Sequence, residues 1–213
     1  MSTGAGAEGP TRSVTGDTAG TAAAVARQRL AEPNGWWGMV LFLCAEVTLF
    51  GTLIGTYFYL DFGAHRWPPA GIKAPSVVLP AVITAVLLTS SVPMLLAVRA
   101  SRAGARQPVA WLIVLALVIQ TAFLAVQIYL FRHDFLQFSP QATAYGSIYF
   151  TLLAAHDAHV LFGLLLDLGV LWHVGARKLN NYWLIGVRSL ALYWHVVNVL
   201  AVLVVLTQLS PSL

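Results

Sequence analysis

Hydrophobic residues along the chain are grouped into five long runs that are separated by short polar segments. The runs cover about 36–60, 76–98, 109–131, 146–174 and 189–209. Each has about 20 or more residues, enough for a helix rising 1.5 Å per residue to cross roughly 30 Å of hydrocarbon. The runs are continuous, so they lack the period of two that a membrane-embedded strand requires. The pattern predicts an all-α integral membrane protein, a bundle of five transmembrane helices.

The segment before the first run has a different character. Residues 1–33 are rich in Gly, Ala, Thr and Ser and contain no apolar run. A secretory signal needs about 7–15 consecutive apolar residues, so this segment does not resemble one. We expect a disordered tail at 1–33, followed by a transmembrane domain at 34–213.

Composition supports the membrane assignment and argues against another class. Of the residues, 58% are hydrophobic and 9% are charged, whereas soluble domains contain about 25% charged residues. The net charge of +4 comes from small basic groups between the runs. Nucleic-acid binding would need a continuous basic face, which this spacing does not supply.

The distribution of basic residues predicts an orientation. Nine of the twelve Lys and Arg residues lie in the tail, the second loop and the fourth loop, and three lie in the other connections. Cytoplasmic loops are the ones enriched in Lys and Arg. We therefore expect the N-terminus in the cytoplasm and the C-terminus outside.

One carboxylate lies deep within a predicted span. Glu46 follows the start of the first run by ten residues, about 15 Å along the helix and near mid-bilayer. Ionisable groups at that depth cost about 2.5–3.5 kcal/mol and are functional candidates. We expect Glu46 to be protonated, proton-linked and reactive toward a hydrophobic carbodiimide. The alternative is a neutral carboxyl that only forms a hydrogen bond with a neighbouring helix.

Polar residues also gather in the last two runs. His156 and His159 are three residues apart, and His195 and Asn198 have the same spacing; the fourth run also contains Asp167. Residues three apart share a helix face. We expect His156, His159, His195 and Asn198 to form an interhelical polar network that sets helix rotation. The alternative is a metal held by the three histidines.

The supply of ligands argues against a cofactor bound by the chain itself. Two stacked hemes need matched histidine pairs on two helices, and after His159 and His173 only His195 remains at a suitable depth. Cys44 is the single cysteine, so a thiolate cage is excluded. No phosphate loop or common catalytic motif occurs. We predict no catalytic residue, metal ligand or cofactor in this chain.

Five segments together resemble a known family. They are "LCAEVTLFGTLIGTYFYL" with Glu46, "WPP" at 67–69, "AYGSIYF" at 144–150, "HDAHVLFG" at 156–163 and "YWHVVNVLAV" at 193–202. In this order and spacing they resemble subunit III of the heme–copper oxidases, the cytochrome c and quinol oxidase group, in its five-helix bacterial form. The resemblance extends from about residue 36 to the last run.

Three positions depart from the family pattern. Asn198 stands where an Asp is usual, Ala201 where a Trp is usual, and Leu130 where a Glu is common. The loss of two carboxylates puts in doubt any ion pair made at those positions. A companion subunit of a nitric oxide reductase is therefore an alternative.

The resemblance implies a role in a larger enzyme. The parent complex of the bacterial plasma membrane reduces oxygen to water and translocates protons, with hemes and copper held by subunits I and II. Subunit III is a cofactor-free companion that packs against subunit I, binds phospholipid, supports proton uptake and protects against turnover inactivation. Candidate lipid headgroup contacts are Trp67, Arg177 and Lys178, the last two just beyond the fourth run.

A free-standing transporter is the alternative from another class. Transporters often contain internal repeats and broken helices, and Pro80 and Pro93 could kink the second span. Five spans do not divide into two equal halves, and no self-similarity is visible. Co-purification with heme-bearing chains would distinguish an oxidase subunit from a transporter.

Overall fold

The computed structural model describes residues 34–72, 78–176 and 181–212, so the tail expected at 1–33 lies outside the described residues. The described chain is helical apart from its connections, and it contains no strand. The elements are α2 (Asn34–Gly63), α3 (Val78–Thr89), α4 (Ser91–Arg102), α5 (Arg106–Gln137), α6 (Ala144–Ala176), α7 (Asn181–Leu209) and a short 3-10 turn, η1 (Ser210–Ser212).

Five of these helical units are long and apolar enough to cross a membrane, with α3 and α4 counted together. This confirms the predicted all-α fold with five transmembrane helices. The helices extend past the apolar runs at most ends; α5, for example, has 32 residues and rises about 48 Å. A helix keeps satisfying its own backbone in the headgroup layer, so polar end residues remain helical.

The second span is broken at Ser90, between α3 and α4. Pro93 has no backbone N–H to donate to the carbonyl of Thr89, and its ring crowds that carbonyl. The chain tightens there, because the Ser90 N–H donates to the Leu87 carbonyl, three residues back, at 3.0 Å. The Thr89 hydroxyl donates to the Val86 carbonyl at 2.6 Å. Pro93 therefore interrupts this span as expected, whereas Pro80 lies in the first turn of α3, where a proline is tolerated.

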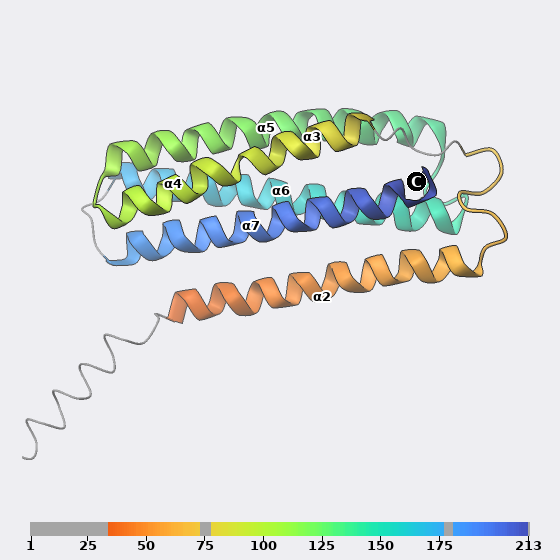
Figure 1. Cartoon of the computed structure of the whole chain (residues 1–213), viewed down its shortest axis with the longest axis horizontal. Coiled ribbons are helices and arrows are strands. Elements are labelled where there is room, and N and C mark those ends of the chain that lie inside the picture. The colour runs from red at the N-terminus through yellow and green to blue at the C-terminus, as the bar shows by residue number, and fades with distance from the viewer. Residues whose placement is uncertain (1–33, 73–77, 177–180, 213) are drawn as a thin grey trace, which may run out of the picture.

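Most of the helices pack against α7, and α2 lies on one side of the bundle (Figure 1). Among the described helices, α7 contacts α2, α3, α4 and α6, whereas α2 contacts only α6 and α7. In the most apolar stretch of each helix, 56% of the residues are buried in α7 and 11% in α2. Most of α2 is thus left for lipid or for another subunit.

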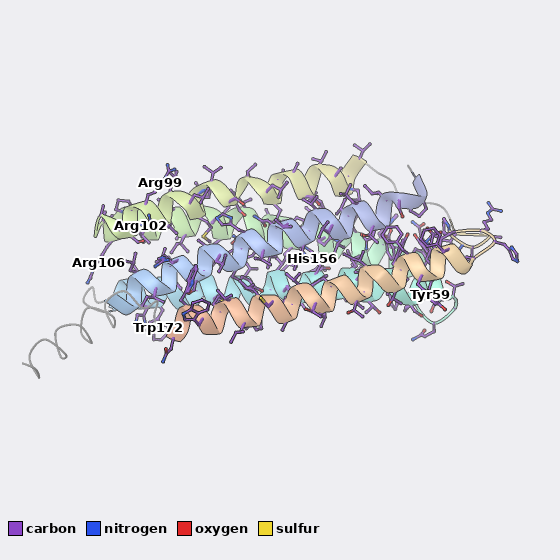
Figure 2. All side chains as sticks on the ribbon, turned by 60° about the horizontal axis from the view of Figure 1, so that its bottom comes forward. Tyr59, Arg99, Arg102, Arg106, His156 and Trp172 are labelled. Carbon is purple, nitrogen blue, oxygen red and sulfur yellow. The ribbon has the colours of Figure 1, made fainter. Side chains whose placement is uncertain are left out.

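Basic side chains mark one end of the bundle. Arg99, Arg102 and Arg106 lie at the same end as Trp172, His156 lies about midway, and Tyr59 lies at the other end (Figure 2). These three arginines form the second of the basic segments from which the orientation was predicted. The orientation in the membrane remains a prediction.

A close approach between α6 and α7 depends on Gly163. A Cβ at this position would lie 2.5 Å from Cζ2 of Trp194 and 2.9 Å from Cε1 of Tyr193. Both aromatic side chains are fully buried. Small residues allow transmembrane helices to pack this closely.

Gly163→Ala is expected to lower the stability of the folded chain by about 1–3 kcal/mol, because the added methyl forces the two aromatic rings to shift. Gly169→Ala on the same helix is the control, since its Cβ meets nothing within 4 Å. Thermal unfolding in detergent measures both variants. Equal melting temperatures for the two variants would contradict the close-packing account.

Candidate functional site

Glu46 of α2 and His159 of α6 form a contact within the membrane-spanning region. The Oε2 atom of Glu46 lies 2.5 Å from Nε2 of His159, and each side chain is 17% exposed. The residues are 113 positions apart in sequence, so the contact connects two spans. Of the histidines in the last two spans, His159 is the one bonded to Glu46.

The hydrogen bonds of His159 limit where protons can lie. Its Nδ1 is 2.6 Å from the backbone carbonyl of Ala155. A carbonyl only accepts, so Nδ1 carries a hydrogen. One further proton then lies between Nε2 and Glu46, either on the carboxyl or on the imidazole. The pair is neutral overall in both cases, which lowers the cost of placing it at membrane depth.

The surroundings of the pair hold the imidazole in place. The ring of Phe50 meets the His159 ring edge-on, with centroids 5.2 Å apart. The hydroxyl of Tyr193 on α7 donates to the His159 carbonyl at 2.7 Å. Three helices therefore fix one side chain. The arrangement can hold a single proton between the carboxyl and the imidazole.

The network expected from His156, His159, His195 and Asn198 does not form as one unit. His156 is buried beside Phe123 of α5, and neither of its ring nitrogens has a partner among the described residues. A spacing of three residues is about 300° of helix rotation, which leaves the two histidines of α6 about 60° apart. His159 thus meets α2, whereas His156 points to α5. Nε2 of His195 is likewise without a partner in the described chain.

Asn198 makes its own contact at the break in the second span. Its Nδ2 donates to Oγ of Ser91 at 2.8 Å and lies 3.4 Å from Oγ of Ser90. The residue is buried. The departure from the family's usual Asp therefore places a neutral amide against two hydroxyl groups, and α7 is linked here to the start of α4.

A second polar cluster was missed as a site by the sequence analysis. Asp167 of α6 is fully buried and accepts from the indole N–H of Trp194 at 3.2 Å. The amide of Gln120 on α5, oriented to suit its neighbours, donates to the other Asp167 oxygen at 2.7 Å. A glutamine in the middle of an apolar run was the available signal for this three-helix contact.

Of the three residues expected to contact lipid headgroups, Trp67 lies within the described residues. Arg177 and Lys178 lie outside the described residues. The Trp67 ring stands edge-on to Tyr57 and Tyr145, with centroids 5.4 and 5.0 Å away. Trp67 also lines a cavity of about 510 Å³ together with Arg66 and Tyr59. This cavity offers a cation and aromatic rings to a headgroup.

The alternative of a metal held by the three histidines is not matched by any ligand set in the described chain. No group of three or more His, Cys, Asp or Glu side chains positioned for a metal occurs among residues 34–72, 78–176 and 181–212. His159 is engaged with Glu46 and Ala155, so the three histidines do not converge.

Known proteins resemble the chain over most of its length. The sequence model of the family described as cytochrome c oxidase subunit III matches residues 21–209. A Synechocystis protein named cytochrome c oxidase subunit 3 is 34% identical, over 64% of this chain and 58% of the relative. The Alkalihalophilus pseudofirmus protein of that name is 34% identical, over 65% and 68%. A probable quinol oxidase subunit 3 from Staphylococcus haemolyticus is 30% identical, over 70% and 73%.

Glu46→Leu and His159→Leu are each expected to lower the free energy of unfolding by about 1–3 kcal/mol, because each leaves a polar partner unsatisfied. The double variant should cost little more than either single change, since neither polar group then remains unpaired. Denaturant unfolding in micelles measures this coupling. The control combines Glu46→Leu with Asn198→Leu, whose effects should add to within about 0.5 kcal/mol. Simple additivity within the Glu46–His159 pair would contradict the contact.

Proposed function

The chain belongs to the cytochrome c oxidase subunit III family and is a subunit of a terminal oxidase, and we propose that it supports the complex's proton uptake through Glu46 and His159. The supporting observation is the 2.5 Å contact between Glu46 Oε2 and His159 Nε2. With Nδ1 of the imidazole bound to Ala155, the pair holds one proton that can lie on either partner.

The pair is suited to transfer rather than to permanent storage. Moving the proton between the carboxyl and the imidazole changes no net charge, and the mutual attraction of carboxylate and imidazolium offsets part of the cost of separating charge in hydrocarbon. Each partner remains 17% exposed, so a neighbouring subunit can reach the pair. Glu46 is thus the proton-linked residue of the proposal, and His159 positions and neutralises it.

The assembled enzyme, in this proposal, reduces oxygen to water and couples that reaction to proton translocation across the bacterial plasma membrane. Its hemes and copper are held by subunits I and II, and this chain supplies no cofactor or catalytic residue. The small supply of histidine and cysteine ligands supports that division of labour.

Subunit I is the proposed direct partner, with subunit II in the same complex. Helix α2 supports an interface of this kind, because it packs on only two of the helices that the structure describes. Its face away from the bundle presents small residues, including Gly51 and Gly55, whose Cβ positions meet nothing within 4 Å. Small residues are typical of contacts between transmembrane helices.

Phospholipid binding completes the proposal. Arg177 and Lys178 follow α6 on the side expected to be cytoplasmic, where basic side chains attract anionic headgroups. At the other end, Arg66 and Trp67 line the 510 Å³ cavity. A guanidinium beside an interfacial indole is a suitable arrangement for a phosphate-bearing headgroup.

Glu46→Gln should abolish carbodiimide labelling at this position and reduce proton uptake or turnover lifetime modestly, because the amide keeps the shape but cannot titrate. Assembly and most oxygen reduction should survive, since the proposed redox centres lie in other subunits. Proton stoichiometry in reconstituted vesicles is the measurement. Glu32→Gln, which changes a carboxylate before the first span, is the matched control. An unlabelled Glu46 together with unchanged stoichiometry and lifetime would assign it a structural role only.

Replacing both Arg177 and Lys178 with Gln should reduce the anionic phospholipid retained by the purified complex. The expected loss is about 1 kcal/mol of attraction for each basic residue removed. Lipid analysis by mass spectrometry measures the retained amount. The control replaces Arg99 and Arg102 with Gln, a second basic pair on the same side. Unchanged retention in the Arg177 and Lys178 variant counts against this lipid site.

A further inference from the structure

A second cavity lies where four helices meet, at the end of the bundle where α5 and α7 finish. It has a volume of about 400 Å³, and its lining comes from α3, α5, α6, α7 and the residue after α5. Each of these five segments contributes, for example, Leu79 (α3), Asp134 (α5), Tyr149 (α6), Val205 (α7) and Phe138 (after α5). We call it the four-helix pocket. It is separate from the Glu46–His159 pair and from the cavity beside Trp67.

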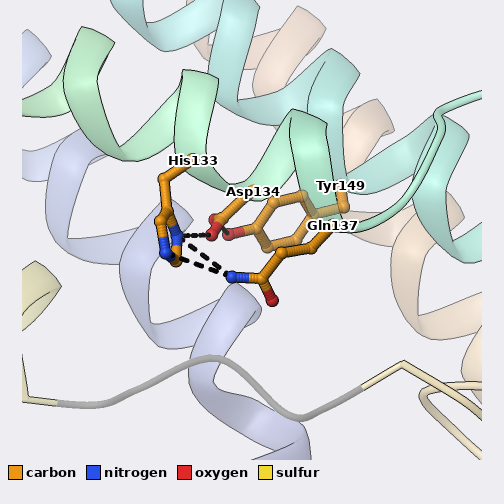
Figure 3. A network of polar contacts seen from close by, with 4 residues as sticks. All are labelled: His133, Asp134, Gln137 and Tyr149. Carbon is orange, nitrogen blue, oxygen red and sulfur yellow. Dashed lines mark hydrogen bonds and ion pairs between the residues drawn. The ribbon is translucent and has the colours of Figure 1, made fainter.

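One wall of the four-helix pocket is polar (Figure 3). The Tyr149 hydroxyl donates to Oδ2 of Asp134 at 2.7 Å, and Nδ1 of His133 lies 3.3 Å from Oδ1 of the same carboxylate. The amide nitrogen of Gln137 lies 3.2 Å from the His133 ring. The contacts join α5 to α6 and hold the carboxylate and the imidazole at the pocket.

Gln208 of α7 supplies a donor with nothing to bind. Its side chain lines the pocket and is 5% exposed, and its Nε2 is buried without a hydrogen-bond partner in the described chain. A buried amide left unsatisfied costs about 1–3 kcal/mol, so such groups usually have a partner. An acceptor oxygen inside the pocket would satisfy it.

The size and charge of the pocket restrict the class of ligand. A volume of about 400 Å³ exceeds the roughly 30 Å³ share of one water and falls in the range of small-molecule sites. Apart from the amides of Gln127 and Gln208, the rest of the lining is largely apolar, with Leu79, Leu130 and Val205 among it. Among the residues that the structure describes, no Lys or Arg lines it, unlike the cavity that contains Arg66. An anionic phosphate would therefore meet the Asp134 carboxylate without a Lys or Arg from these lining residues to compensate.

We propose that the four-helix pocket binds the head of a neutral amphiphile that carries hydroxyl or carbonyl oxygens. An oxygen of the head accepts from Gln208, a second polar group meets His133 and Asp134, and the apolar tail leaves between helices into the membrane. An isoprenoid quinone and a diacylglycerol both have this chemistry. The site is additional to the proton-linked and phospholipid roles proposed above, and it requires neither of them.

The test is photolabelling of the purified oxidase complex with a short-tailed benzoquinone bearing a diazirine, followed by peptide mass spectrometry of this chain. Labelling is expected in the last turns of α5 and α7. Unlabelled benzoquinone and dioleoylglycerol serve as separate competitors, so the effective one identifies the source of the head. Dioleoylphosphatidylglycerol tests an anionic headgroup.

Two variants change the pocket, and one serves as the control. Val205→Phe fills the cavity and should remove the labelling, and Gln208→Leu should weaken it about tenfold through the lost hydrogen bond. Without ligand, Gln208→Leu should fold at least as stably as the wild type, because it removes an unsatisfied amide. Val199→Phe, on the exposed face of α7, should leave labelling unchanged. Diffuse labelling, competition by phosphatidylglycerol alone, or full labelling of Val205→Phe would overturn the proposal.

Discussion

Polar groups that enter hydrocarbon have no water to bind, and this constraint shapes the whole structure. The backbone meets it by forming helices, but the side chains must find partners on neighbouring spans. Glu46 meets His159 between α2 and α6, Asp167 meets Trp194 between α6 and α7, and Asn198 meets Ser91 between α7 and α4. With Gln120 on α5, these contacts connect every span of the bundle, so helix rotation is set by a few polar side chains.

The position of the proton-linked pair depends on how closely α6 and α7 approach. Gly163 leaves room for the rings of Tyr193 and Trp194, and those two residues then bind different parts of α6. Tyr193 reaches the His159 carbonyl, and Trp194 reaches Asp167. A methyl group at Gly163 would therefore affect the imidazole of His159, which faces Glu46. It would also affect the buried carboxylate of Asp167, about one turn beyond Gly163 on α6.

Two of the departures from the family pattern have a local physical account. Asn198 lies against hydroxyl groups at the break in the second span, where its neutral amide donates to Ser91 and places no charge in the buried contact. Leu130 lines the four-helix pocket together with Asp134, which follows it by one helical turn. The pocket thus keeps a carboxylate although residue 130 does not provide one. Nothing in the structure explains Ala201, a buried residue in the core.

The sequence by itself determined the five spans, because run length acts locally, and it offered Pro80 and Pro93 as the two places where the second span could kink. The three-residue spacing of His156 and His159 placed them about 60° apart around α6, which did not decide whether they meet the same neighbour. Only the tertiary structure decided that His159 meets Glu46 while His156 faces Phe123. The period of a helix gives relative angles, but the absolute rotation comes from its neighbours. For the same reason, Gln120 and Trp194 could be recognised as partners of Asp167 only after α5, α6 and α7 were placed together.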